Sequence, residues 1–265
     1  EPRKPKEFFR FCFVGDTGMG KTELAAHFPD PFILDYEDKL AGVRHELHPD
    51  GNVAYWTVTG KDTWGEVDKF TTAFLAGDGK KVAEILAKPG RLASPGEWSV
   101  ANRRTLVDDG LTEMAELMKA PAGAAVSGGI QERRAPGLDK PIKQFGGEKG
   151  SAYGLRDYLL FERFRQMRGL RCHYILTAYY QIEGVPELNN QVRFLPLIDG
   201  KFGPPRVFGH FDEVYWMQKH VMGKKISWTL DTQGDGISRF CATRLKIETG
   251  SVAAWETIEA ALKGG

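Results

Sequence analysis

The chain has few cysteines and no long apolar run, and each shortage argues against a class of protein. Its three cysteines, Cys12, Cys172 and Cys241, lie far apart in separate apolar runs, so we expect reduced core residues of an intracellular protein. No CxxC pair or His/Cys cluster indicates a zinc site. The chain contains no run of about 18 apolar residues, the length that would predict a membrane span. We therefore expect no membrane partner and a cytoplasmic location.

The chain also has almost no net charge. Its formal value of +1 gives no overall field that would attract a nucleic acid or a membrane surface, so any basic surface must be local. The 265 residues, 42% of them hydrophobic, suffice for one large α/β domain. We expect a flexible lead-in over residues 1–8, which has no apolar signal core, and a single domain over residues 9–265.

Residues 15–22, GDTGMGKT, match the phosphate-loop pattern G-x-x-x-x-G-K-[ST] at each required position. The apolar run at residues 9–14 predicts a strand before the loop, and TELAAHF predicts a helix after it, which Pro29 ends. Glycines leave room for backbone N–H groups to surround phosphate oxygens, and the helix N-terminus adds partial positive charge. The sequence therefore predicts a nucleoside triphosphate site, which we take to bind ATP. Its expected binding residues are Gly15, Asp16, Thr17, Gly18, Met19, Gly20, Lys21, Thr22 and Glu23.

Side chains of the loop and of a neighbouring strand predict a magnesium site. Lys21 is expected to reach the β- and γ-phosphates, and the hydroxyl of Thr22 to hold Mg²⁺. TLVDD, at residues 105–109, predicts a strand that ends in two carboxylates, Asp108 and Asp109. Because side chains alternate along a strand, the two point in opposite directions. We expect Asp109, at the tip, to be the second metal ligand.

A catalytic carboxylate is expected at the end of the strand predicted at residues 31–36. In a parallel sheet, this end lies at the edge that carries the phosphate loop. Glu37 could therefore face the γ-phosphate and polarise the attacking water, with Asp35 and Asp38 as competing choices. Thr177 ends the strand predicted within RCHYILTAYY, and its hydroxyl could contact a phosphate or a metal-bound water.

Further candidates come from the second half of the chain. Tyr179 or Gln181 could couple the phosphate site to the loop that follows. RFCATRLKIE predicts a strand with Arg244 and Lys246 on one face. A neighbouring subunit could supply this pair to the γ-phosphate, as an arginine finger does, and Arg206 is a rival. The alternative is an exposed basic stripe on an edge strand, which protects against aggregation.

The order of the expected elements predicts the architecture. Strands alternate with helices in the first half, which predicts a parallel, doubly wound sheet, and strand-like runs after residue 213 should extend it. An insertion at residues 60–104 contains a helix that Asp62 would cap and has no assigned role. Two Gly- and Pro-rich stretches, 121–150 and 183–210, are expected to be mobile loops.

Together these motifs resemble the RecA-like ATPases, and more narrowly the short phage-encoded nucleotide-binding proteins that carry little more than a RecA core. GDTGMGKT is similar to the Walker A loop, and FILDYED to the strand that ends in the catalytic glutamate, which falls on Glu37. TLVDDGLTEM resembles the Walker B strand, with Asp109 at the family aspartate and Gly110 in place of the commoner serine. HYILTAYY, GHFDEVYWM and ATRLKIE resemble three further stretches. The resemblance covers roughly residues 8–248.

The resemblance implies a RecA-like P-loop NTPase fold, with a mostly parallel central sheet flanked by helices and a β-rich C-terminal extension. It implies ATP hydrolysis with Mg²⁺, coupled to single-stranded DNA in phage recombination, replication or strand annealing. It further implies a homo-oligomer with ATP at the subunit interfaces, in the cytoplasm of a bacterial host.

In that architecture the two predicted loops would face DNA. Residues 119–149 contain six basic and three acidic residues, and such side chains can contact phosphates in a salt-dependent way. Phe145 or Tyr153 could stack a base. A solvated loop without a ligand is the alternative. The residues expected to contact DNA are Arg133, Arg134, Lys140 and Lys143.

Two other functions share the phosphate loop. One is a nucleotide or small-molecule kinase, in which Arg133 and Arg134 would belong to a lid. The 87 residues between Lys21 and Asp109 favour an ATPase with an extra strand over a kinase. The other is an assembly or packaging component whose nucleotide is structural. The lack of an N-K-x-D motif argues against a GTPase.

Overall fold

The computed structural model describes most of the chain as one set of strands and helices. The described residues are 7–40, 53–59, 62–89, 91, 101, 104–127, 150–169, 171–185, 191–199, 204–234 and 239–264. The strands are β1 (Arg10–Val14), β2 (Pro31–Asp35), β3 (Ala54–Thr57), β4 (Thr105–Asp109), β5 (His173–Ala178), β6 (Tyr180–Val185), β7 (Gln191–Pro196), β8 (Glu213–Met222), β9 (Lys225–Asp231) and β10 (Ser251–Val252). The helices are α1 (Lys21–Ala26), α2 (Trp64–Ala76), α3 (Gly79–Leu86), α4 (Leu111–Ser127), α5 (Gly150–Gln166), α6 (Pro204–Val207) and α7 (Trp255–Gly264), with 3₁₀ turns at Met167–Gly169 and Phe208–His210.

Eight strands form the central sheet, in the order β10-β9-β8-β1-β5-β4-β2-β3. The six strands from β8 to β3 pair in parallel, whereas β9 and β10 join antiparallel at one side. This arrangement confirms the predicted α/β class, with a mostly parallel sheet, flanking helices and a β-rich C-terminal extension. Strand β1 lies between β5 and β8, so the loop that follows it emerges in the middle of the sheet.

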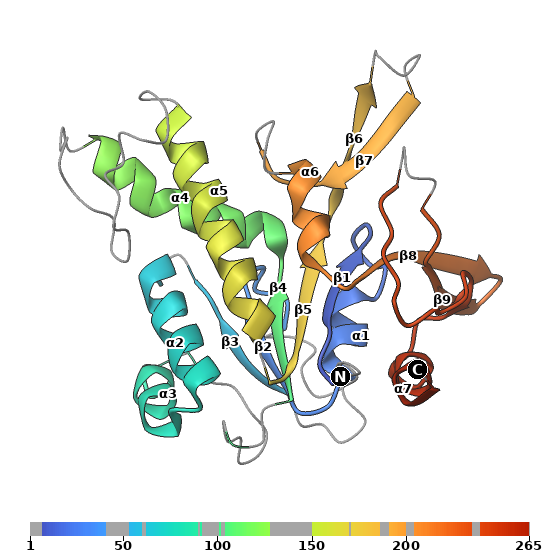
Figure 1. The fold of residues 1–265 in the computed structure, drawn as a ribbon, viewed down its shortest axis with the longest axis horizontal. Helices are drawn as coiled ribbons and strands as arrows, with labels where there is room; N and C mark the ends of the chain where they lie inside the picture. The colour runs from blue at the N-terminus through green and yellow to red at the C-terminus, as the bar shows by residue number, and fades with distance from the viewer. Residues whose placement is uncertain are drawn as a thin grey trace, which may run out of the picture.

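Alternation along the buried strands supplies a core on each face of the sheet. In β1, Cys12 and Val14 pack on one face with α2, α4 and α5, whereas Phe11 and Phe13 pack on the other with α1 and α7. Figure 1 shows α4 and α5 side by side across one part of the molecule and α7 beneath the β8–β9 region. Because helices cover both faces of the sheet, the central strands bury apolar side chains on both sides, as is typical of parallel strands.

A fully buried ion pair joins the sheet to α5. Arg163 donates two hydrogen bonds to Asp108, at 2.9 and 2.8 Å, and neither side chain is exposed. The hydroxyls of Tyr36 and Tyr174 donate to the same carboxylate, at 3.1 and 2.6 Å. Arg163 also bonds Thr71 of α2. Asp108 therefore has its oxygen atoms satisfied inside the core and serves packing.

Four expectations about local structure are corrected. Helix α2 begins after Thr63, which forms a capping box with Glu66, whereas Asp62 bonds the backbone N–H of Thr59. Helix α4 continues to Ser127, so the first seven residues of the predicted loop 121–150 are helical, and 128–149 lie outside the described residues.

The second predicted loop also contains regular structure. Strands β6 and β7 form an antiparallel hairpin that is separate from the main sheet, and Figure 1 shows it projecting away from the other strands. Helix α6 follows at Pro204–Val207. The stretch 183–210 is therefore not irregular throughout, and its mobility stays a prediction.

The strand predicted over RFCATRLKIE does not form. Ala242 makes a single bridge to Val214, and Lys246 has a left-handed φ of 55°, which breaks an extended run. Strand β9 instead takes the place beside β8 through a tight hairpin at Gly223. Among the described residues, no helix combines the length and the apolar character needed to cross a bilayer.

Candidate functional site

The phosphate loop turns sharply between β1 and α1. Gly18 and Gly20 have φ angles of 75° and 79°, in the left-handed region that glycine enters without a Cβ penalty. Gly15 donates its backbone N–H to the carbonyl of Ala178 at the end of β5, at 3.1 Å. The loop is thereby fixed against the strand that carries Thr177, and the first turn of α1 follows directly.

Lys21 folds back over the loop. Its ammonium donates to the carbonyls of Gly15 and Asp16, at 2.7 and 2.9 Å, and lies 4.2 Å from the centre of the Tyr179 ring. The residue is only 8% exposed. Burial lowers the pKa of Lys21 to about 8, although the carboxylates of Glu37 and Asp109 act in the opposite direction.

Thr22, Asp109 and Thr177 meet beside the loop. The hydroxyl of Thr22 lies 2.9 and 3.0 Å from the two oxygens of Asp109. The hydroxyl of Thr177 donates to Asp109 Oδ1 at 2.6 Å and accepts the backbone N–H of Gly110 at 2.9 Å. Strand pairing explains the meeting, because Asp109 and Thr177 are register partners in β4 and β5. The structure thus brings together three of the predicted site residues.

The two carboxylates of β4 face different surroundings, as alternation requires. Asp109 lies beside the phosphate loop, whereas Asp108 is bonded within the core by Arg163. Burial raises the pKa of Asp109 to about 6, and repulsion from Glu37 and Asp35 adds to the effect, against hydrogen bonds from Thr177 and Thr22. A positive charge at this position would relieve the buried carboxylate.

The donor set around Asp109 suits Mg²⁺. A hydroxyl and a carboxylate supply hard oxygen ligands, which Mg²⁺ prefers, and it keeps water or phosphate oxygens in its other positions. Across the described segments, no group of three or more His, Cys, Asp or Glu side chains could hold a metal. Thr22 and Asp109 are the residues that could hold the ion, together with oxygens from a bound nucleotide and water.

Glu37 reaches the same edge of the sheet from a turn after β2. The buried carboxylate of Asp35 accepts the backbone N–H groups of Glu37, Lys39 and Leu40, at 3.1, 3.3 and 3.0 Å. Asp38 takes a left-handed φ of 54° in this turn. Asp35 is therefore occupied in shaping the turn, whereas Glu37 and Asp38 both line a cavity at this edge of the sheet.

Two residues that surround Glu37 were not assigned this position from the sequence. Tyr179, expected only to couple the site to a loop, donates its hydroxyl to Glu37 Oε2 at 2.9 Å. Lys39, which the sequence analysis missed, bonds both Glu37 and Tyr179. Burial opposes the charge on Lys39, but these hydrogen bonds outweigh it and raise its pKa. A lysine two residues after a candidate carboxylate was the available signal.

A cavity of about 490 Å³ opens in front of Glu37. Glu113 of α4 also borders it, and burial together with the charge of Glu37 raises the pKa of Glu113. Gly110 packs against Glu37, because a Cβ at that glycine would lie 2.7 Å from Glu37 Cγ. The lining residues are Thr17, Tyr36, Glu37, Asp38, Lys39, Val58, Thr59, Glu113 and Tyr179.

The β6–β7 hairpin is joined to the phosphate loop at its base. Tyr180, the first residue of β6, donates its hydroxyl to Asp16 Oδ2 at 3.0 Å. Tyr179 precedes it and contacts Lys21. No contact places Gln181 at the loop within the described part of the chain. The tyrosine pair is therefore the link between hairpin and loop.

Arg244, one of the basic residues proposed as a finger, lies away from the phosphate loop of its own chain. Arg244 is 67% exposed and lies 3.3 Å from Asp212, which Arg10 also binds through two bonds of 2.9 Å. Arg10 begins β1, so this is the edge of the sheet opposite the phosphate loop. Lys246 is exposed nearby in sequence, and Arg206 is exposed on α6. Within one subunit, Arg244 is not brought to the loop.

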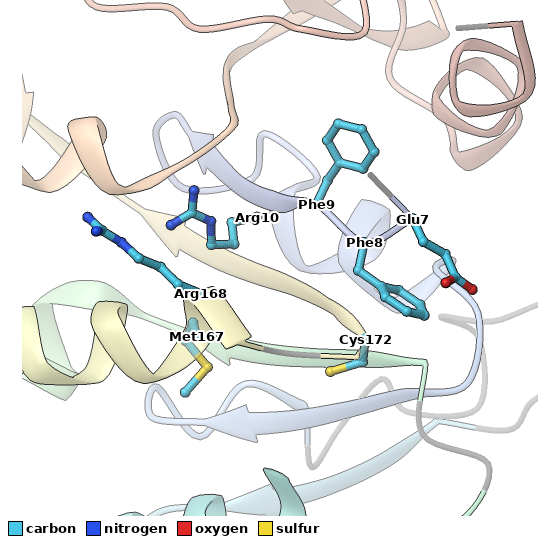
Figure 2. Close-up of a pocket in the computed structure, with 7 residues that line it drawn as sticks. All are labelled: Glu7, Phe8, Phe9, Arg10, Met167, Arg168 and Cys172. Atoms are coloured by element: carbon cyan, nitrogen blue, oxygen red, sulfur yellow. The ribbon is translucent and has the colours of Figure 1, made fainter. Parts of the chain in front are cut away.

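A cavity of about 210 Å³ lies at that opposite edge. Figure 2 shows the side chains of Arg10 and Arg168 extending to the same side, with Met167 and Cys172 below them. The residues that line this cavity are Glu7, Phe8, Phe9, Arg10, Met167, Arg168 and Cys172. These residues share no member with the phosphate site.

One of the residues predicted to contact DNA lies within the described part of the chain. Tyr153 is described, and it is 42% exposed and lies near Lys119 and Arg156. The other predicted contacts lie outside the described residues: Arg133, Arg134, Lys140, Lys143 and Phe145.

Comparisons with known proteins give one family. A family model described as "AAA domain" matches residues 7–236, which is most of the chain. No curated protein matches the chain in sequence. Among solved structures, the chain is similar to the KaiC-like protein PH0186 from Pyrococcus horikoshii OT3, with 12% identity and a TM-score of 0.39, over 88% of this chain and 83% of that one.

Proposed function

The chain belongs to the AAA domain family, and from this membership we propose that it binds ATP with Mg²⁺ at its phosphate loop and hydrolyses it. One observation carries the proposal most directly. Thr22, at the start of α1, contacts both carboxylate oxygens of Asp109, at the end of β4. A P-loop ATPase needs this pairing of hydroxyl and strand-end carboxylate to hold its metal.

Each residue then has a role that follows from its position. The ammonium of Lys21, which now bonds loop carbonyls, would bond the β- and γ-phosphates. Thr22 and Asp109 would hold Mg²⁺, which when bound neutralises charge on the phosphates. Thr177 fixes the Asp109 carboxylate through its 2.6 Å bond and is a positioning residue.

Glu37 would activate the attacking water. The water oxygen bonds the γ-phosphorus while the bond to the β–γ bridging oxygen breaks, giving ADP and phosphate, and Glu37 accepts the water proton. Tyr179 and Lys39 hold the carboxylate of Glu37 in place. The phosphoryl acceptor in this proposal is water, and a nucleotide or small-molecule kinase remains the alternative.

The test is a measurement of phosphate release with Mg²⁺ and labelled ATP. Lys21→Ala and Glu37→Gln should each abolish turnover. Lys21→Ala removes the ammonium that would bond the phosphates, and Glu37→Gln removes the carboxylate that would accept the water proton. Label that moves to a nucleoside monophosphate instead of water would establish the kinase alternative. If the natural role survives Lys21→Ala, the nucleotide is structural, as in an assembly component.

We propose further that the active form is a homo-oligomer that acts on single-stranded DNA, as in phage recombination or replication. The resemblance of the motifs to RecA-like ATPases supports this, and so does the contact of Tyr180 with Asp16, which joins a projecting hairpin to the loop. Arg244 or Lys246 would act on the ATP of a neighbouring subunit. Hydrolysis should accelerate with single-stranded DNA at low salt, and sizing with a non-hydrolysable analogue should show assembly. An unchanged rate would contradict the DNA role.

A further inference from the structure

A second cavity adjoins the phosphate loop on the side away from Asp109. Its volume is about 260 Å³, which is below the usual size of a pocket for a whole ligand. Helix α1, strand β9 and the start of α7 form its walls. Its lining residues are Gly20, Glu23, Leu24, His27, Met217, Trp228, Ala253, Ala254, Trp255 and Glu256.

The topology of the sheet gives the direction in which a nucleotide would run. Asp109 ends β4 and Glu37 follows β2, both on one side of β1, and they mark the end of the site that would take the γ-phosphate. Strands β8 and β9 lie on the other side of β1. A nucleotide whose terminal phosphate faces β4 therefore leads its nucleoside toward β8 and β9.

Trp228 stands at the loop on that side. Trp228 of β9 pairs with Lys219 of β8. Lys219 lies two residues after Met217, which lines the cavity. The indole of Trp228 lies 3.5 Å from the point that a Cβ would occupy if Gly20 had one. The indole N–H donates to the carbonyl of Gly18 at 3.4 Å. An aromatic ring is thus held against the turn of the phosphate loop.

The opposite wall is fixed by packing with the segment before α7. Ala253 donates its backbone N–H to the carbonyl of Trp228 at 3.0 Å. The ring of Trp255 lies 4.5 Å from that of Phe28 in the core. Both walls are therefore held in place by contacts that a ligand need not supply.

The chemistry of the lining suits a neutral base better than a second phosphate. Glu23 and Glu256 place carboxylates at the cavity, and no Lys or Arg belongs to its described lining. Carboxylates repel phosphate but accept hydrogen bonds from the amino groups of a base. An indole face attracts a flat ring, and a purine offers more stacking surface than a pyrimidine.

We propose that this cavity binds the purine base of the nucleotide, with Trp228 as the stacking residue that sets a preference for purine over pyrimidine. The inference rests on the proposed function, because it assigns the nucleoside end of the same ligand. It adds a specificity-determining residue that no phosphate-loop motif contains.

The experiment compares two probes, ATP and inorganic tripolyphosphate, by calorimetric titration with Mg²⁺. Trp228→Leu should weaken ATP binding about tenfold through loss of stacking and leave tripolyphosphate binding unchanged. Trp228→Phe, which keeps a smaller ring, should lose less. Ile226→Ala, on the same strand and face but outside the cavity, should match the unaltered protein. UTP should bind the unaltered protein more weakly than ATP.

The possible failures are distinguishable. If neither probe binds the unaltered protein, or Lys21→Ala leaves both affinities intact, the proposed function fails. If Lys21→Ala loses both probes while Trp228→Leu keeps the affinity for ATP, only the base assignment fails. If Trp228→Leu loses affinity for ATP and for tripolyphosphate equally, the indole only supports the loop. That result would also overturn the base assignment. Should Trp228→Leu not fold, Trp228→Phe and the ATP-to-UTP ratio decide.

Discussion

The hydroxyl of Thr22 lies 2.9 Å from Asp109 Oδ2, although 87 positions separate the two residues. The contact arises because β4 lies two strands from β1, with β5 between them, and Thr177 of β5 bonds Asp109 from that intervening strand. Three elements from distant parts of the chain therefore determine where this carboxylate points.

We expect Asp109→Asn to reduce ATP hydrolysis by about 100-fold, the usual scale for removing one electrostatic contact in a site. The amide keeps the shape of the side chain but loses the charge that would hold Mg²⁺. The same change should raise the melting temperature without nucleotide, because it removes a buried charge whose pKa is already raised. Parallel assays of phosphate release and thermal unfolding test both effects. Equal turnover at saturating Mg²⁺ would contradict the assigned role.

Gly110→Ala should disturb Glu37 directly. Gly110 has a φ of 110°, and an added Cβ would lie 2.7 Å from Glu37 Cγ. We expect a loss of about 1–3 kcal/mol in the free energy of unfolding from backbone strain, together with a fall in turnover at unchanged ATP affinity. Urea titration and single-turnover assays measure these.

Gly250→Ala is the matched control for that substitution. Gly250 also has a positive φ, 88°, but nothing lies within 4 Å of an added Cβ. It should show the strain cost without the loss of turnover. A similar fall in turnover in both variants would mean that strain alone, and not displacement of Glu37, is responsible.

Arg163→Met should destabilise the fold by about 3–5 kcal/mol, because it leaves Asp108 as a buried charge without its cation. Adding Asp108→Asn in the same chain should recover part of the loss. Arg165→Met removes a partly exposed pair with Glu162 and should cost less than about 1 kcal/mol. Chemical denaturation of the four proteins measures these differences. Equal effects at positions 163 and 165 would contradict the buried-pair account.

His173 should make the fold sensitive to acid. Burial, with a smaller effect of Arg104, lowers its pKa from 6.5 to about 4. Between these values the unfolded chain binds a proton that the folded chain does not, so stability falls as the pH drops from 6.5 toward 4. The contribution is up to about 3 kcal/mol. His173→Gln should flatten the pH dependence of urea midpoints, and an identical slope in both proteins would refute the assignment.

The sequence predicted the phosphate-loop half of the site because its signals are local. GDTGMGKT fixes the loop by itself, and the apolar runs ending at Val14 and Asp109 mark parallel strands whose carboxyl ends share an edge. Alternation within TLVDD predicted that Asp108 and Asp109 face opposite ways, and the resemblance to the Walker B strand favoured Asp109. These local features predicted that Thr22 and Asp109 share a site, and the pairing of β1, β5 and β4 brings the two side chains into contact.

The remaining part depended on tertiary contacts that no local pattern contains. Lys39 bonds Glu37 only because Asp35 closes the turn after β2 around its carboxylate. RFCATRLKIE has the alternation of a strand, but it makes only the Ala242–Val214 bridge to β8, and β9 pairs with the rest of that edge. The β6–β7 hairpin was missed because glycine and proline near its turn outweighed the alternation in QVRFLP.

The carbonyls of Gly15 and Asp16 already have a cation in Lys21. An incoming polyphosphate must compete with these carbonyls for the same ammonium, so its measured affinity will understate the direct attraction between lysine and phosphate. Replacing Lys21 therefore removes an internal brace as well as an external contact. A lower affinity of Lys21→Ala for polyphosphate would combine the loss of the lysine–phosphate contact with the loss of the bonds to Gly15 and Asp16. The alanine variant alone does not separate these two losses.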